Sequence, residues 1–352
     1  MSYELTIEPL GETIEVEEEQ SILDACLRAG IWLPYACNHG VCGTCKIDIV
    51  DGEVAHNHAS SFALMDVERA EQKCLACCAT LETDVTIEAD IEEEPDALSL
   101  PIEDHAATVE KIENLTPTIK GIWLAVPGDG LEFQAGQYIN LHVPGLEQPR
   151  AFSIASSPAE PNLIELNIRR VDGGEATNYL HDELNVGDDL QISGPMGRFF
   201  VRKSAPEPML FLAGGSGLSS PKSMIQDLLE HGDERSITLL YGARNPNEIY
   251  YQNLFEKLAI EHENFTYMIA ISEEDDAWSG DCCFVHELAE KHFDNQFAGH
   301  KAYLCGPPPM IDACITSLMR GRLFEEHIFM ENFFTAADAA EPARRSALFK
   351  KF

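Results

Sequence analysis

Three cysteines in the run YACNHGVCGTCK carry the most specific chemistry of this sequence. Cys37, Cys42 and Cys45 are spaced C-x₄-C-x₂-C, which is the spacing of three ligands of a plant-type 2Fe–2S cluster, with a lone fourth cysteine expected well downstream. Gly40 and Gly43 between them allow a tight backbone turn with N–H groups directed at the cluster sulfurs. The motif predicts a centre that transfers one electron at a time.

Zinc, disulfides and plain buried thiols are the competing interpretations of these cysteines. Structural zinc usually requires two paired C-x-x-C or C-x-x-C/His units, and only Cys42 and Cys45 form such a pair here. Disulfides require an oxidising compartment, whereas the N-terminal MSYELTIEPL has no basic or apolar region typical of a secretion signal. We therefore favour the iron–sulfur interpretation and expect a cytoplasmic protein.

The fourth cluster ligand must come from the segment KCLACCATLETDVTIE. Cys74, Cys77 and Cys78 follow Cys45 after 28, 31 and 32 intervening residues. Spacing alone does not choose among these three cysteines.

A second motif, RAFSIAS, follows the expected strand QYINLHVPG. The guanidinium of Arg150 can clamp a pyrophosphate, the ring of Phe152 can cover a planar ring system, and the hydroxyl of Ser153 can reach a heteroatom. An ordinary barrel strand is the alternative interpretation of this motif alone.

Two further loops follow apolar strands. The loop Ala213–Gly217 comes directly after MLFL, and a Gly-rich turn between a strand and a helix brings backbone amides and a helix dipole onto a phosphate. The segment LCGPPPM at 304–310 ends another strand and contains Cys305. The first loop is not G-x-G-x-x-G and is weak evidence alone, and Cys305 taken alone is also compatible with an inert thiol.

The helices and strands expected around these motifs follow three different patterns along the chain. Residues 3–8 and 12–17 alternate as paired strands, and residues 21–29 form a helix with Cys26 on its apolar face. The cluster loop at 35–45 precedes the strand KIDIVDGEV, which contains an Asp51-Gly52 turn. This order resembles the β-grasp fold of plant-type ferredoxins.

Beyond the polar segment that begins EEEPD, residues 106–203 show short alternating strands separated by Gly/Pro turns, which predicts an antiparallel barrel. From about residue 209, apolar strands alternate with helical segments such as 220–230 and 249–261, which predicts a parallel α/β sheet. The expected fold class is thus multidomain α+β: a β-grasp domain, an antiparallel β-barrel and a Rossmann-like α/β domain.

Charge limits the classes of partner. The net charge of −36 argues against nucleic acid and anionic membranes as partners. The sequence contains no run of 18 apolar residues, so it predicts no membrane-spanning helix. Residues 1–95 hold 21 acidic and 4 basic side chains, so the cysteine-rich third is the most acidic per residue. Such a surface can steer the domain to a basic protein partner, or it can serve solubility alone.

The order of the three modules resembles the reductase components of bacterial multicomponent oxygenases, the ferredoxin–FAD–NAD oxygenase reductase family. The resemblance covers nearly the whole chain and is strongest to the phenol hydroxylase branch, on segments such as SFALMDVERAE, GGSGLSSPKSMI and AYLCGPPPMIDA. It implies domains at 1–95 (ferredoxin), 104–203 (FAD) and 204–335 (NAD). It also implies a linker at 96–103 and a C-terminal tail at 336–352.

The family also implies roles for individual residues. Its reductases close the cluster with a Leu-Ala-Cys run, and Leu75-Ala76-Cys77 makes Cys77 the fourth ligand. Ser153, Cys305 and Glu331 are the implied residues at the reacting rings, where Cys305 approaches the nicotinamide. The implied cofactor-binding residues are Arg150, Phe152, Ser153, Ile168, Arg169, Gly174, Ala176, Thr177, Phe333, Gly214, Gly215, Ser216, Gly217, Glu248, Cys305, Gly306 and Pro307.

By this resemblance the protein is an NADH-dependent oxidoreductase of phenol and aromatic hydrocarbon breakdown. Electrons pass from NADH to one FAD, to one 2Fe–2S cluster and then to the di-iron hydroxylase component. Glu248 favours NADH because a carboxylate repels a 2′-phosphate, although Arg244 nearby could meet one. The alternatives are a reductase for a Rieske dioxygenase, a stand-alone NADH:acceptor oxidoreductase, and a non-enzymatic iron–sulfur carrier or sensor.

Overall fold

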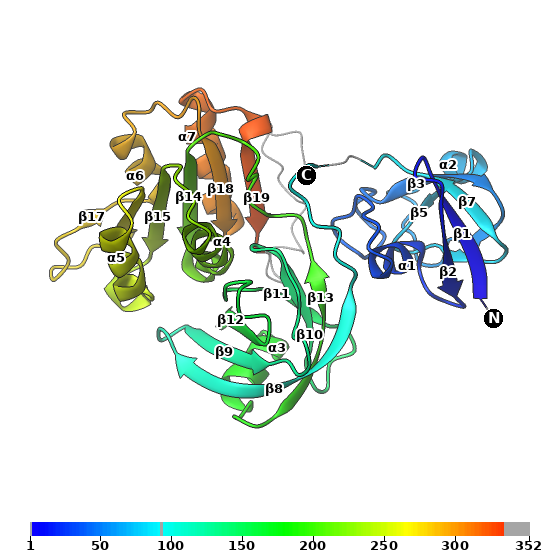
Figure 1. Ribbon diagram of the computed structural model, residues 1–352, viewed down its shortest axis with the longest axis horizontal. Helices are drawn as coiled ribbons and strands as arrows, with labels where there is room; N and C mark the ends of the chain where they lie inside the picture. Colours follow the sequence, from blue (N-terminus) through cyan, green and yellow to red (C-terminus); the bar gives the residue numbers. More distant parts are fainter. Residues whose placement is uncertain (1, 92–93, 334–352) are drawn as a thin grey trace. The chain divides into compact units, whose positions relative to one another are not determined.

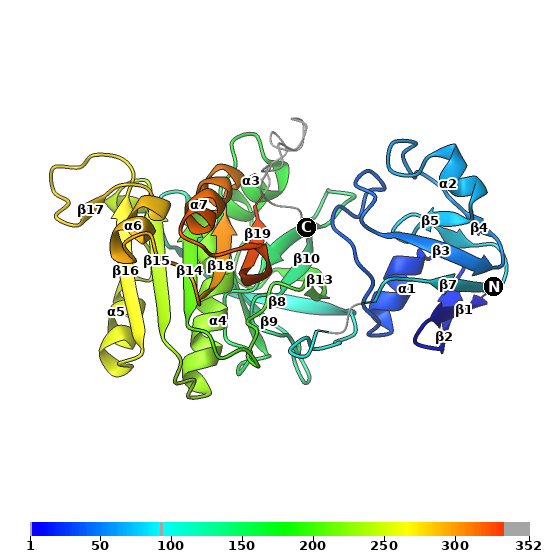
Figure 2. The same ribbon diagram turned by 90° about the horizontal axis from the view of Figure 1, so that it is seen from above.

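The computed structural model describes residues 2–91 and 94–333, and the expected tail at 336–352 lies outside them. The described residues divide into two compact units, with the boundary between Glu103 and Asp104. Each unit is described by itself below (Figures 1 and 2).

The first unit is built on a five-stranded sheet of order β2-β1-β7-β3-β5, with β1 and β7 parallel and the other neighbours antiparallel. Together with α1 it forms the expected β-grasp fold. Its sheet strands are β1 (Ser2–Glu8), β2 (Glu12–Glu17), β3 (Lys46–Asp51), β5 (Lys73–Leu75) and β7 (Val85–Glu88). The remaining elements are α1 (Ile22–Arg28), β4 (Val54–Ala55), α2 (Asp66–Ala70) and β6 (Thr80–Leu81).

Helix α1 forms where the sequence predicts it. The Ser21 side chain caps its N-terminus by accepting a hydrogen bond from the Asp24 amide, and Cys26 is fully buried in the core. The turn expected at Asp51-Gly52 within KIDIVDGEV is confirmed. The chain turns at Gly52, where φ is +95°, and the following β4 pairs with β6 in a separate two-stranded sheet.

The second unit begins with a six-stranded antiparallel sheet of order β11-β10-β13-β8-β9-β12. A bridge between Ile154 and Leu166 brings its two edges together, so the sheet curls into the expected barrel around an aliphatic core. Its elements are β8 (Glu103–Asn114), β9 (Ile119–Ala125), β10 (Tyr138–His142), β11 (Arg150–Ser153), β12 (Leu163–Arg169), α3 (Glu175–Asp182) and β13 (Asp189–Met196).

The rest of the second unit is a parallel sheet of order β17-β16-β15-β14-β18-β19. Helices α4 and α5 cover one face and α6 and α7 the other (Figure 2). Its strands are β14 (Met209–Gly214), β15 (Ile237–Ala243), β16 (Phe265–Ile271), β17 (Asp281–Cys282), β18 (Lys301–Gly306) and β19 (Ile328–Asn332). Its helices are α4 (Ser219–Glu230), α5 (Gln252–Glu261), α6 (Val285–His292) and α7 (Pro308–Arg320).

The strand order reverses beside β14, whose neighbours are β15 on one side and β18 on the other. In open α/β sheets, ligands bind outside the carboxyl ends of the strands at such a switch point. The two glycine-containing loops singled out from the sequence follow β14 and β18, so the topology brings both loops to this point.

Helix α5 begins later than the sequence predicts. Residues 246–248 form a short 3₁₀ turn, and Tyr251 adopts a left-handed conformation with φ of 57° before the α-helix starts at Gln252. The expected helix from residue 249 is therefore wrong by one turn.

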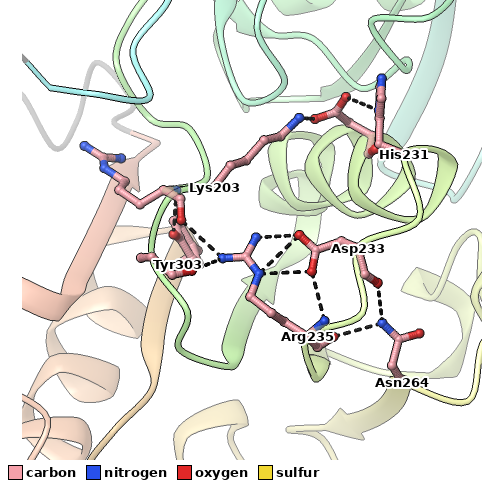
Figure 3. A network of polar contacts seen from close by, with 9 residues as sticks. Lys203, His231, Asp233, Arg235, Asn264 and Tyr303 are labelled. Carbon is pink, nitrogen blue, oxygen red and sulfur yellow. Dashed lines mark hydrogen bonds and ion pairs between the residues drawn. The ribbon is translucent and has the colours of Figure 1, made fainter.

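The connection from the barrel to the parallel sheet is fixed by a polar network (Figure 3). Arg235 pairs with Asp233 and donates to the carbonyl groups of Arg202 and Ala205. Asn264 donates to the carbonyl groups of Asp233 and Arg235 at 2.7 and 2.9 Å. These contacts tie residues 202–205 to the loop after α4 and hold the entrance of β14 in place.

Candidate functional site

The predicted cluster cysteines form two close pairs. The Cys42 thiol is within hydrogen-bonding range of Cys37, and the Cys45 thiol is within range of Cys77. Within residues 2–91 and 94–333, no three Cys, His, Asp or Glu side chains surround one point where a single metal ion would bind. Two pairs of cysteines instead suit a cluster of two irons that each take two cysteine ligands.

The cysteine pairs shift thiol pKa values in opposite directions. Burial raises the pKa of Cys42, but hydrogen bonds with Thr44 and Cys37 outweigh it and lower this pKa to about 7. The hydrogen bond with Cys77 is the largest cause that raises the pKa of Cys45, and burial is the second. Bringing several thiolates together without cations is unfavourable, and positively charged iron removes that penalty.

The glycines of the cluster loop are required by close packing. Gly40 has φ of +68°, and a Cβ there would lie 2.5 Å from the Cys78 Sγ. Gly43 has φ of +77° and packs on Ala63. The His39 amide lies 3.4 Å from the Cys37 Sγ and donates to it, as expected for a loop that directs N–H groups at sulfur.

Cys74 and Cys78 occupy different positions from Cys77. Cys74 is fully buried on β5 within the domain core, and burial raises its pKa to about 12. Cys78 is also buried, with its Sγ 3.4 Å from His58 Nε2 and 3.6 Å from Cys77 Sγ. The described loop therefore brings Cys77, the half-buried one of the three, into contact with Cys45.

A second convergence of predicted residues lies at the sheet switch point. The Glu331 carboxylate on β19 accepts hydrogen bonds through Oε2 from Ser153 Oγ at 2.9 Å and from Ser220 Oγ at 2.7 Å. Cys305 Sγ lies 3.6 Å from the same oxygen. Three motifs that are far apart in the sequence thus meet on one carboxylate, which joins the barrel to the parallel sheet.

Burial controls ionisation in this cluster of side chains. It raises the pKa of the Glu331 carboxyl, and hydrogen bonds from Ser220, Ser153 and Cys305 oppose that shift. Burial, with the Glu331 charge as a second cause, raises the pKa of the Cys305 thiol well above its ordinary value. Cys305 is therefore a neutral thiol at physiological pH.

The other residues predicted to bind flavin lie on the barrel around this point. Arg150 is exposed on β11 and donates to the carbonyl of Gln148 at 2.8 Å, while Phe152 is half-buried on the same strand. On β12, Ile168 is buried and Arg169 is exposed.

The predicted glycine-pair motif begins helix α3. Gly174 is the N-cap residue, Ala176 is buried, and the Thr177 hydroxyl accepts from the Val171 amide at 3.1 Å. A Cβ on Gly174 would lie 2.8 Å from Thr177 Oγ1. The motif thus builds a tight helix start in which the Thr177 hydroxyl is occupied by local structure.

The Gly-rich loop after β14 packs directly on the end of β18. A Cβ on Gly217 would lie 2.4 Å from the Cys305 carbonyl oxygen, and Gly215 has φ of +56°. Ser216 is buried in this loop. Phe333 is half-buried after β19, and its amide donates to the Gly306 carbonyl at 3.0 Å.

A cavity of about 450 Å³ opens beside these loops. Among the predicted residues, Arg169, Gly214, Gly215, Glu248 and Pro307 line it. Its walls come from both the barrel and the carboxyl ends of β14, β15 and β18. A Rossmann-like domain binds its dinucleotide in this position.

Glu248 is held by the barrel as well as by its own loop. Its Oε2 accepts hydrogen bonds from Thr116 Oγ1 at 3.0 Å and Thr118 Oγ1 at 2.5 Å, and its Oε1 lies 3.4 Å from Arg244 Nη2. The carboxylate therefore faces the cavity with a fixed orientation.

Several residues of the site are absent from the sequence-based prediction. No role was assigned from the sequence to Ser220 on Glu331, to the two threonines on Glu248, or to the cavity residues Phe284, His286 and Met310. For Ser220 and Met310 a signal existed, because they lie in the quoted segments GGSGLSSP and LCGPPPM.

Models of three domain families match the chain. The 2Fe-2S iron-sulfur cluster binding domain matches residues 5–82, the oxidoreductase FAD-binding domain residues 106–201, and the oxidoreductase NAD-binding domain residues 211–315. The fold and these domains define an NADH-dependent iron–sulfur flavoprotein oxidoreductase. Its cofactors are a 2Fe–2S cluster and FAD. The two cysteine pairs fit the cluster, and the cavity fits the dinucleotide substrate of the NAD-binding domain.

Full-length relatives extend this result. The chain is 56% identical over 100% of its length and 100% of the relative's length to "Phenol 2-monooxygenase, reductase component DmpP" of Pseudomonas sp. (strain CF600). It is 56% identical to "Phenol hydroxylase P5 protein" of Acinetobacter pittii (strain PHEA-2), with 99% of each chain covered. The solved structure of an Amycolatopsis cytochrome P450 reductase, GcoB, matches with a TM-score of 0.84 at 30% identity, covering 94% of this chain and 98% of that one. The chain belongs to the ferredoxin–FAD–NAD oxygenase reductase family.

Proposed function

We propose that this protein is the reductase component of a multicomponent phenol hydroxylase. It takes electrons from NADH and delivers them singly to the di-iron oxygenase component. The observation that carries the proposal is the 56% identity along the full length of two phenol hydroxylase reductases. In the described part of the chain no helix is both long and apolar enough to cross a membrane, and we propose a cytoplasmic location.

The proposed cluster ligands are Cys37, Cys42, Cys45 and Cys77. The contacts of Cys42 with Cys37 and of Cys45 with Cys77 support this set. The amide of His39 at Cys37 Sγ stabilises negative charge on a ligand sulfur. Removing a true ligand abolishes the cluster, so Cys77→Ser should lose the visible absorbance of the cluster and Cys74→Ser should keep it. The opposite result would show that Cys74, and not Cys77, is the fourth ligand.

FAD, when bound, supplies two-electron uptake from NADH and release of single electrons. The residues proposed to act at its ring are Ser153, Cys305 and Glu331. Glu331 orients the Ser153 and Ser220 hydroxyl groups and the Cys305 thiol, because it accepts from both hydroxyls and lies beside the thiol. Burial keeps the Cys305 thiol neutral, so its proposed role beside the nicotinamide is to position the ring and not to attack it as a nucleophile.

The barrel is proposed to hold the rest of FAD. Arg150 is exposed, and its guanidinium would exchange its local bonds to the Gln148 and Pro149 carbonyl groups for bonds to a pyrophosphate. The N-terminus of α3 after Gly174 offers amide groups to the same phosphates. Phe152, Ile168, Arg169, Ala176, Thr177 and Phe333 complete the proposed flavin-binding set. A pyrophosphate site of this kind suits FAD rather than FMN.

The 450 Å³ cavity is proposed to bind NADH. Gly214–Gly217 present backbone amides to the phosphates, and Gly306 and Pro307 face them from the end of β18. Glu248 is proposed to accept a ribose hydroxyl and to disfavour a 2′-phosphate. Its hydrogen bonds to Thr116 and Thr118 keep the carboxylate directed at the cavity.

Reconstitution tests the proposal. NADH-dependent hydroxylation should appear when the purified protein is mixed with the oxygenase component of a phenol hydroxylase, and NADPH should support it poorly. The oxygenase component of a Rieske dioxygenase is the control, motivated by the similar fold of "Ferredoxin reductase in carbazole 1,9a-dioxygenase" at a TM-score of 0.77 and 26% identity. Turnover with the dioxygenase and none with the phenol hydroxylase would overturn the assignment.

A further inference from the structure

The cluster loop is bordered by exposed apolar side chains. Phe62 is 96% exposed, Val41 is 62% exposed and Met65 is 51% exposed. A single exposed aliphatic residue is ordinary, but an aromatic ring almost wholly in water at a redox centre is not. We name Val41, Phe62 and Met65 the apolar patch.

Backbone contacts place the members of the apolar patch around the same loop. Val41 lies between Gly40 and the proposed ligand Cys42. The Ser60 amide donates to the Gly40 carbonyl at 2.9 Å. Gly43 also lies close to this segment, because a Cβ added to it would be 3.4 Å from the Ala63 carbonyl oxygen. The segment that carries Phe62 is therefore packed against both glycines of the cluster loop.

The Phe62 ring is presented by an anchored turn. The Ala63 and Leu64 amides donate to the Ser60 carbonyl, and both of these side chains are buried. Arg69 donates to the Ala59 carbonyl at 3.0 Å and holds the start of the turn. With both following residues fixed inward, the turn directs Phe62 outward, and little backbone conformational entropy of the turn remains to be lost on docking.

The charges of this unit limit what can cover the patch. All four basic side chains of residues 1–95 are occupied within the unit: Arg28 by Asp24, Lys46 by Glu68, Lys73 by Asp48 and Arg69 by Ala59. The large acidic excess of this third of the chain thus remains on its surface. Anionic lipid and a second copy of this chain are both repelled by it.

We propose that the apolar patch is the docking surface for the oxygenase component. The proposal rests on the proposed function. The partner surface has an apolar socket for Phe62 and a rim of Lys or Arg side chains that pairs with the acidic surface. The ring acts as the central anchor of the interface and the charges guide encounter. Docking at Val41 places the partner one residue from a cluster ligand, where electron transfer requires it.

The test measures NADH-driven turnover as the reductase is titrated against a fixed amount of phenol hydroxylase oxygenase component. Phe62→Ser should raise the half-saturating reductase concentration on the order of tenfold or more, as removal of an interface anchor does. Val50→Ser is the matched control, because Val50 is 59% exposed on β3 of the same unit and lies outside the patch. Val50→Ser should leave the titration unchanged.

Two readouts separate docking from internal defects. Ferricyanide reduction by NADH and the rate of cluster reduction after mixing with NADH should both be unchanged in Phe62→Ser. Unchanged saturation in Phe62→Ser would overturn the proposal. Slower cluster reduction would also overturn it, because the patch would then serve transfer from the protein's own flavin.

Failure of the proposed function gives a different pattern. In that case the unsubstituted protein supports no turnover with the phenol hydroxylase. The same titration is then made with the oxygenase component of the Rieske dioxygenase. A raised half-saturating concentration in Phe62→Ser but not in Val50→Ser would support the docking surface, and equal values would overturn it.

Discussion

A buried ion pair joins the parallel sheet's helices to the flavin barrel. Lys222 of α4 lies with its Nζ 2.8 Å from Glu165 Oε2 of β12, and the two side chains are 5% and 7% exposed. Lys222 also donates to the Ala155 carbonyl at 2.8 Å, and Tyr251 donates to the other Glu165 oxygen at 2.5 Å. Both charges are thus neutralised and hydrogen-bonded inside the protein.

Lys222→Met keeps the length of the side chain but leaves the Glu165 carboxylate without its counter-charge. Removing one member of a buried pair costs about 3–5 kcal/mol, since the remaining charge stays desolvated. The Ala155 carbonyl loses its donor as well, which adds about 1 kcal/mol. Each kcal/mol lowers the Tm of a unit of this size by about 2–4 °C. The Tm of Lys222→Met should therefore fall by at least roughly 8 °C.

Thermal unfolding followed by release of flavin fluorescence measures this change. Lys257→Met is the control, because Lys257 and Glu261 form an exposed pair at 3.6 Å, and such pairs contribute about 0–1 kcal/mol. The double variant Lys222→Met/Glu165→Leu should recover much of the loss, since no charge is then buried unpaired. The reasoning is refuted if Lys222→Met is as stable as Lys257→Met, or if the double variant is no more stable than Lys222→Met.

Three further predictions concern single carboxylates and their donors. Burial raises the folded-state pKa of Glu331 above its ordinary value of 4.5, so its contribution to stability is complete below pH 4.5 and is lost as the pH rises through the folded pKa. In urea unfolding at several pH values, the wild type should lose free energy of unfolding relative to Glu331→Gln over that range. Parallel pH profiles of the two proteins would contradict this expectation. Ser220→Ala removes one donor from Glu331 and should slow flavin reduction by NADH about tenfold in stopped-flow absorbance, whereas Ser223→Ala on the same helix should not, since Ser223 Oγ has no hydrogen-bond partner among the described residues. Glu248→Gln should narrow the preference for NADH over NADPH on the order of tenfold in kcat/KM; an unchanged ratio would remove Glu248 from nucleotide selection.

The modules and much of the site followed from sequence because each motif occurs at the end of a regular element. Alternating strands predicted the barrel, and apolar strands with intervening helices predicted the parallel sheet. The meeting of Ser153, Cys305 and Glu331 was inferred from family motifs, and the structure brings these three side chains together. Their roles in the reaction stay predictions.

The misses have local or long-range causes. The positive φ value at Tyr251 delays the start of α5, and it does not alter the hydrophobic periodicity of the segment. The contacts of Glu248 with Thr116 and Thr118, and of Lys222 with Glu165, join residues 57 to 132 positions apart. Pairings of that length depend on the tertiary arrangement, which no local pattern encodes.

The position of Glu331 on β19 has a consequence for synthesis of the protein. β19 is an edge strand, paired only with β18, and it is the last strand among the described residues. Domains emerging from the ribosome fold from the N-terminus onward, so the barrel and five strands of the parallel sheet can form before this carboxylate arrives. Its contacts with Ser153, Ser220 and Cys305 can close only after those five strands have been made. A chain that stops before β19 would therefore lack the carboxylate on which these three side chains meet.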